Sequence, residues 1–89
     1  MKAPRIDSTH NAIVCALRDM GASVTSLAAV GLGVPDLVVG WRHQNFLLEV
    51  KSEKGQLNLY QKAFHRMWNG QVAVVRTPDD ALRAIGAIK

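Results

Sequence analysis

The apolar residues at the start of the chain recur with the spacing of an amphipathic helix. One stripe of this helix consists of Ile6, Ile13, Leu17 and Met20. Asp7 or Ser8 can cap its first turn, and Gly21 stands where a helix C-terminal glycine belongs. We therefore predict a helix that ends at about Met20. The following residues, 22–27, favour a short strand, and the small, glycine-containing residues 28–34 favour a loop.

Two runs rich in β-branched and aromatic residues come next, separated by a short polar segment: 36–41 and 46–51. A short polar connection joins antiparallel strands, so these runs predict a β-hairpin. We centre its turn between Arg42 and His43. In that register Asp36 lies opposite Glu49, at the end of the hairpin away from the turn.

The C-terminal part of the chain predicts two more helices with a strand between them. Asn58 and Gln61 have the spacing of a capping box, which begins a helix that we expect to end at Gly70. Residues 72–76 favour a strand. Thr77, followed by a proline and two acids, is a strong start for a last helix. The expected order is α-β-β-β-α-β-α, an α/β fold with a mixed sheet flanked by helices.

Composition adds few constraints to this picture. A chain of 89 residues fits one domain over residues 1–89, and its 48% hydrophobic and 20% charged residues are typical of a globular protein. We find no apolar run long enough for a membrane span or a signal peptide. The single Cys15 cannot form an internal disulfide, so we expect a cytoplasmic protein.

Candidate chemistry gathers on the predicted hairpin. Glu49 and Lys51 are two residues apart on one strand, so their side chains leave by the same face, whereas Leu48 and Val50 point toward the core. Directly opposed residues of a hairpin have Cβ atoms about 4.5–5.5 Å apart. The register therefore sets the carboxylates of Asp36 and Glu49 side by side, with an ammonium group next to them.

Two like charges that face each other on a sheet are destabilising, so a positive partner is needed. Lys51 can supply part of it as an ion pair. A divalent cation can supply more, and two clustered oxygen ligands suit Mg²⁺ or Mn²⁺ better than Zn²⁺. Water on such an ion can attack a phosphodiester, and Lys51 can stabilise the charge that develops.

These residues resemble a known signature. The motif Gly33-Val34-Pro35-Asp36, followed by Glu49-Val50-Lys51, is similar to that of PD-(D/E)xK nucleases. With the short hairpin and residues 57–61 and 70–74, the chain resembles stand-alone VRR-NUC domains of phages and prophages, from about residue 5 to residue 82. The resemblance implies a restriction-endonuclease-like fold, Mg²⁺ or Mn²⁺ as cofactor, and a homodimer that cuts branched DNA such as four-way (Holliday) junctions.

The resemblance also implies roles for individual residues. Asp36, Glu49 and the backbone carbonyl of Val50 would be metal ligands, Lys51 would be the catalytic lysine, and Gln61 would help to place the phosphate or the attacking water. Gln61 serves equally well as the second half of the Asn58 capping box, which is a purely structural role.

The family often has a further Glu or Gln on its first helix, and residues 7–12 of this chain contain neither. Either Asp7 or His10 takes the role of that Glu or Gln, or no residue of this chain does. This departure keeps a second hypothesis open, in which the chain is a non-catalytic nucleic-acid-binding module with the nuclease fold. In a third, the acids and Lys51 form only a structural ion-pair network.

The net charge of +4 favours a polyanionic partner such as DNA. Five basic residues could contact phosphates or simply be solvated: Arg42, Lys54, Lys62, Arg66 and Arg76. Trp41, Phe64 and Trp68 are interpreted as core or dimer-interface residues. These aromatic residues, together with the small size of the chain, support the expectation of a homodimer.

Overall fold

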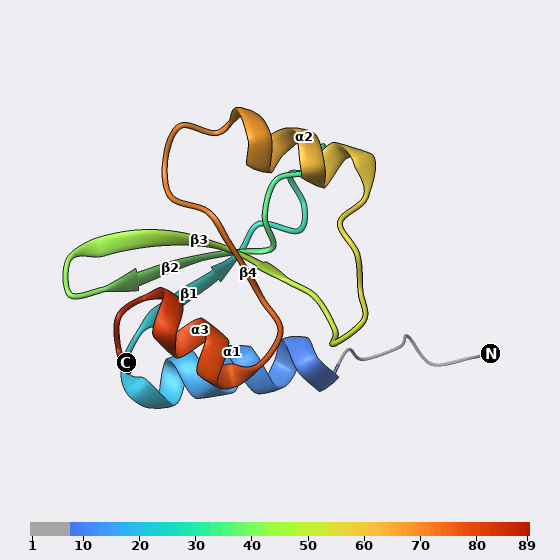
Figure 1. Cartoon of the computed structure of the whole chain (residues 1–89). Coiled ribbons are helices and arrows are strands. Elements are labelled where there is room, and N and C mark those ends of the chain that lie inside the picture. Colours follow the sequence, from blue (N-terminus) through green and yellow to red (C-terminus); the bar gives the residue numbers. More distant parts are fainter. Residues whose placement is uncertain (1–7) are drawn as a thin grey trace.

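The computed structural model of the protein describes residues 8–89. Its elements are α1 (Ser8–Met20), β1 (Ser23–Ser26), β2 (Leu37–Trp41), β3 (Gln44–Val50), α2 (Leu59–Met67), β4 (Ala73–Val75) and α3 (Pro78–Ala84). They follow one another in the predicted order. The protein is a small α/β domain with a four-stranded mixed sheet flanked by helices (Figure 1).

The sheet has the strand order β1-β2-β3-β4. The first three strands are antiparallel, and β4 lies parallel to β3 because the chain between them crosses over through α2. In the β2–β3 hairpin Leu37 pairs with Leu48 and Trp41 pairs with Gln44, which is the predicted register. Both turn residues, Arg42 and His43, have positive φ angles, 51° and 65°, as a two-residue type I′ turn requires.

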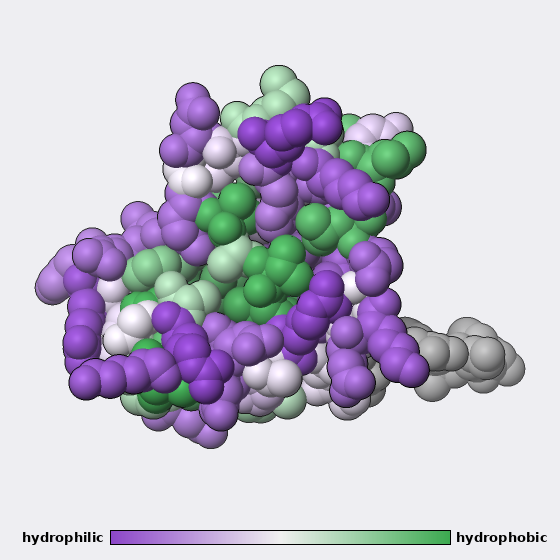
Figure 2. Space-filling view, in the orientation of Figure 1, coloured by the Kyte–Doolittle hydropathy of each residue, from purple (hydrophilic) through white to green (hydrophobic). Residues whose placement is uncertain are grey.

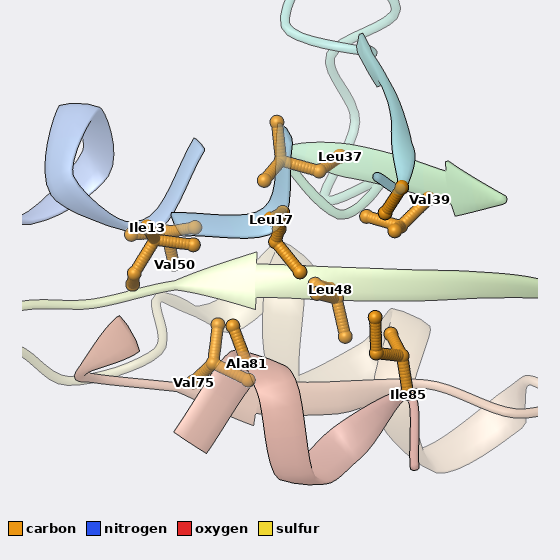
Figure 3. Packing of buried hydrophobic residues seen from close by; sticks show 10 residues of the cluster. Ile13, Leu17, Leu37, Val39, Leu48, Val50, Val75, Ala81 and Ile85 are labelled. Atoms are coloured by element: carbon orange, nitrogen blue, oxygen red, sulfur yellow. The ribbon is translucent and has the colours of Figure 1, made fainter. Parts of the chain in front are cut away.

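The core lies between the sheet and the helices α1 and α3. Side chains from α1, β2, β3, β4, α3 and the residue that follows α3 meet there (Figure 3): Ile13, Leu17, Leu37, Val39, Leu48, Val50, Val75, Ala81 and Ile85. Since side chains alternate along a strand, the residues between these core positions point to the opposite face of the sheet. We call that side the open face. Helix α2 stands over it, away from α1 and α3 (Figure 1), and none of its residues is buried.

The structure corrects or refines three of the sequence predictions. Helix α2 ends at Met67 and not at Gly70, because the backbone of Trp68 is already extended. Of the two interpretations of Trp68, core or dimer interface, the structure excludes the first, because Trp68 is 45% exposed, whereas Trp41 packs against the core. Met20, at the exposed end of α1, is also outside the core. None of the helices within residues 8–89 is long and apolar enough to cross a membrane.

Candidate active site

The predicted pair of carboxylates forms where the β2–β3 hairpin ends. Asp36 directly precedes β2, and Glu49 is the last residue but one of β3. The backbone carbonyl of Asp36 accepts a hydrogen bond from the N–H of Leu27 at 2.7 Å, which ties it to the chain that leaves β1. Pro35 beside it is fully buried. The hydrogen bond from Leu27 and the burial of Pro35 thus fix the position of Asp36 opposite Glu49.

The carboxyl groups of Asp36 and Glu49 are close enough to interact directly. Burial raises the pKa of Glu49 to about 8, and a hydrogen bond with Asp36 and the negative charge of Asp36 add to this effect, while Lys51 opposes it. Asp36 also accepts a hydrogen bond at Oδ2 from the backbone N–H of Val50, at 2.7 Å. That bond satisfies an N–H group beyond the last backbone pair of the hairpin.

Glu49 is only 1% exposed, although it lies on the open face. Its Oε2 accepts a hydrogen bond from Nε2 of Gln61 at 3.3 Å, and its buried Oε1 has no hydrogen-bond partner among the described residues. A buried oxygen without a partner costs about 1–3 kcal/mol. Such an oxygen, on one of two adjacent carboxylates, is a fitting ligand for a hard divalent cation.

The donor set around this pair suits Mg²⁺ or Mn²⁺ in particular. Within residues 8–89 no three His, Cys, Asp or Glu side chains gather as a ligand cluster. A cation held here would rely on Asp36, Glu49, a backbone oxygen such as that of Val50, and water. Few carboxylates and several waters are typical of Mg²⁺, whereas a structural Zn²⁺ site needs four protein ligands.

The side chain of Gln61 completes the predicted capping box and also contacts the acid pair. Its Oε1 accepts a hydrogen bond from the N–H of Asn58 at 2.9 Å, and Oδ1 of Asn58 accepts one from the N–H of Gln61 at 2.9 Å. This completes the capping box of α2. Because the box uses only Oε1, Nε2 remains able to donate to Glu49. Gln61 thus connects the start of α2 to the acid pair.

Gly33 brings α2 to this position. Its φ angle is +82°, and a Cβ atom added to it would lie 2.2 Å from the carbonyl oxygen of Tyr60. The loop before Asp36 therefore touches the backbone of α2 directly, next to Gln61. In the sequence, Gly33 is notable only as part of a motif. Its contact with α2 explains why a glycine is needed there.

Lys51 directly follows β3 and is half-buried beside the acids. Its backbone N–H donates to the carbonyl of Val75 at 3.1 Å, which fixes the start of the side chain. The next residues form a loop that Arg76 holds: Nη1 of Arg76 donates to the carbonyls of Ser52 at 2.6 Å and Gly55 at 2.7 Å. Arg76 therefore supports the loop after Lys51, a role that the sequence did not reveal.

The remaining predicted residues are spread over the molecule. Arg42 lies at the hairpin turn, far from the acids, with its guanidinium 5.2 Å from the centre of the Trp41 ring. Lys54, Lys62 and Arg66 are exposed, the last two one turn apart on α2. His10 is half-buried in the first turns of α1, and Asp7 lies outside the described residues. The structure thus brings together Asp36, Glu49, Lys51 and Gln61, and leaves Arg42 at the opposite end of the hairpin.

Comparison of the chain with protein-family models gave no match, and neither did comparisons with curated proteins and with solved structures.

Proposed function

We propose that the protein is a Mg²⁺- or Mn²⁺-dependent DNA endonuclease of the PD-(D/E)xK class. The observation that supports this best is the buried Asp36–Glu49 pair, with an unpartnered carboxylate oxygen on Glu49 and with Lys51 and Gln61 beside it. If the acids and Lys51 formed only a structural ion-pair network, we would expect each buried carboxylate oxygen to have a partner. The PD-(D/E)xK motif and the order of the elements agree with the same proposal.

Each residue of the site has a place in phosphodiester hydrolysis. Asp36 and Glu49 would hold the cation, which would supply a lowered pKa of water and neutralisation of phosphate charge. The ammonium group of Lys51 stabilises negative charge on the attacking oxygen or on the phosphate. Gln61 keeps Glu49 oriented through Nε2. The oxygen of water bonds to phosphorus, one P–O ester bond breaks, and the leaving oxygen takes up a proton, so that the cut has a phosphate on one side and a hydroxyl on the other.

We propose branched DNA, such as a four-way junction, as the substrate, and a homodimer as the active form. A two-fold dimer presents two identical sites to two strands of like geometry. The exposed Lys54, Lys62 and Arg66 are proposed phosphate contacts, and so are Arg42 and Arg76 in addition to their contacts within the chain. A cytoplasmic location, in a bacterial host, agrees with the single Cys15.

Cleavage of labelled DNA by the purified protein tests this function. Linear, flap and four-way substrates are incubated with Mg²⁺, with Mn²⁺ or with EDTA. We expect cutting only with a metal, and a loss of at least about 100-fold in rate in Asp36→Asn, Glu49→Gln and Lys51→Met. Asp36→Asn keeps an oxygen that can accept from the N–H of Val50, so it removes the charge with little change in fold. Asp19→Asn, an exposed carboxylate of α1, is the matched control.

Undiminished cutting by the Asp36 and Lys51 variants would refute the assigned roles.

A second candidate function, a DNA-binding module without catalysis, has one observation in its favour: the first turn of α1 has no acidic residue. Calorimetric titration with Mn²⁺ separates the two. Salt-sensitive DNA binding without any binding of Mn²⁺ would favour the module.

A further inference from the structure

Trp68, directly after α2, is a large aromatic side chain held in a fixed position at the surface. Its indole stacks on the ring of Phe64, with centroids 4.9 Å apart and an angle of 19° between the planes. On another side it meets the backbone of Gly70, where an added Cβ would lie 2.8 Å from Nε1 of Trp68. Even so, 45% of Trp68 is exposed. The ring is therefore oriented before any ligand arrives.

Trp68 forms one wall of an open hollow of about 270 Å³ between the hairpin and the segment after α2. Its lining is Val38, Asn45, Phe46, Leu47, Trp68, Gly70 and Gln71. Figure 2 shows apolar surface gathered in the middle of this view, below α2, with polar residues around it. An apolar, aromatic-walled hollow of this size suits a flat ring better than an ion.

The hollow lies next to the acid pair on the open face of the sheet. Leu47 and Glu49 are two residues apart on β3, so their side chains share a face and their Cα atoms are about 7 Å apart. Val38, opposite Leu47, has the same relation to Asp36 on the adjoining strand. A DNA strand whose scissile phosphate lies at the carboxylates therefore brings a neighbouring base to the hollow.

The surroundings of Trp68 favour a nucleic-acid strand as its partner. Lys62 and Arg66 are exposed one turn apart on α2, directly before Trp68, in a chain of net charge +4. The amide of Gln71 does not read base edges, because Oε1 accepts from the N–H of Leu47 at 2.6 Å and Nε2 donates to its carbonyl at 3.2 Å. Contact with a base would thus come from stacking, which tolerates any sequence.

We infer that Trp68 is a stacking platform for one unpaired DNA base beside the scissile phosphate. The inference rests on the proposed nuclease function and narrows its substrate class. Bases inside a continuous duplex are stacked on their neighbours and cannot reach the hollow. Bases at a flap, a gap or the branch of a junction can, so the protein selects DNA that contains them.

Binding affinity tests this without cleavage. Fluorescence anisotropy of labelled DNA is measured in EDTA, with a flap duplex and a continuous duplex of equal length. We expect wild type to prefer the flap, and Trp68→Ala to bind it about tenfold more weakly with little change for the duplex. Trp68→Phe keeps a stacking ring and retains most of the preference. Tyr60→Ala, which removes a 67% exposed aromatic of α2 outside the hollow, leaves the preference unchanged.

Tryptophan fluorescence gives an independent readout that does not depend on the stability of Trp68→Ala. The Trp41→Phe variant has Trp68 as its only tryptophan. We expect its emission to be quenched when flap DNA binds, and to change much less when the base next to the cut position is replaced by an abasic sugar. Equal quenching by both strands would contradict stacking on that base.

The outcomes separate this inference from the proposed function. If folded Trp68→Ala binds flap DNA as tightly as wild type while metal-dependent cutting still requires Asp36, the stacking role is wrong and the nuclease stands. If Trp68→Ala only weakens self-association, a second copy of the chain covers Trp68 and the inference is overturned. If wild type binds no DNA even at low salt, the inference and the nuclease proposal both fall.

Discussion

The surroundings of Glu49 have opposing effects on its charge. Burial and the neighbouring Asp36 favour its protonated form, and Lys51 favours its charged form. Gln61 satisfies one of its oxygens and leaves the other without a partner among the described residues. The features that make this residue costly for folding also suit a metal ligand: in the proposed metal site, a bound cation would offset the burial of its charge and the repulsion from Asp36.

The raised pKa of Glu49 predicts how stability depends on pH in metal-free protein. The folded state keeps a proton on Glu49 that the unfolded state loses above its ordinary pKa of 4.5. The unfolded state thus binds fewer protons, and the free energy of unfolding falls as the pH rises from 4.5 to about 8. Denaturant unfolding in EDTA at several pH values measures this slope.

Glu49→Gln is the matched variant for that measurement, because it cannot titrate and is nearly the same size. It should flatten the decline between these pH values and be more stable than wild type above pH 8. An unchanged slope in Glu49→Gln would assign the titration to another group.

The two roles of Gln61 can be separated by changing its partner. Asn58→Ala removes the cap from α2 and should cost about 0.5–2 kcal/mol of stability, while Nε2 of Gln61 can still reach Glu49. Gln61→Ala should cost a similar amount and also lower the rate of DNA cutting. Unfolding curves and cleavage rates of both variants, taken well below their melting temperatures, make the comparison. Equal loss of cutting in both variants would make Gln61 a capping residue only.

At the scale of elements, the site depends on how loops place α2 and the hairpin. Helix α2 buries no residue of its own, so its position follows from its ends and from the approach of Gly33 to the carbonyl of Tyr60. The hairpin places Asp36 opposite Glu49 through its register, which the turn at Arg42 and His43 sets. Both devices use backbone conformations with positive φ, which are costly for residues other than glycine.

Gly33→Ala tests the placement of α2, with Gly31→Ala as its control. Both glycines have positive φ, +82° and +72°, but a Cβ at Gly31 meets nothing within 4 Å. Gly31→Ala should cost about 1–2 kcal/mol of stability and leave cutting intact. Gly33→Ala should cost about 1–3 kcal/mol more, because α2 has to move, and should lower the cleavage rate through Gln61. Equal effects of the two variants would show that the contact with α2 is unimportant.

The β2–β3 turn at Arg42 and His43 can be tested in a similar way. Arg42→Asn with His43→Gly supplies the residues that a type I′ turn prefers, and loses only the contact of Arg42 with Trp41. We expect a gain of about 1 kcal/mol in stability, measured by unfolding. If Arg42 also contacts phosphate, the variant binds DNA more weakly. The slope of log affinity against log salt concentration then becomes less steep by about 1. A less stable variant would mean that the native turn is not strained.

For the molecule as a whole, local patterns predicted the element order, the hairpin register and the meeting of Asp36 with Glu49. These depend on alternation, capping and turn length, which are readable along the chain. The position of α2 was not predictable, because it follows from the close backbone approach at Gly33. Nor was the exposure of Trp68, since an early end of α2 decides it. The support that Arg76 gives to the loop after Lys51 joins residues more than 20 positions apart, and no local signal announces it.

A crystal soaked in Mn²⁺ shows whether Asp36 and Glu49 together hold a divalent cation, as we propose. We expect an anomalous-scattering peak within bonding distance of a carboxylate oxygen of each residue, with Oε1 of Glu49 among the ligands, and no such peak in Glu49→Gln. A soaked crystal without density between the two carboxylates, in which Lys51 instead closes an ion pair with them, would contradict it.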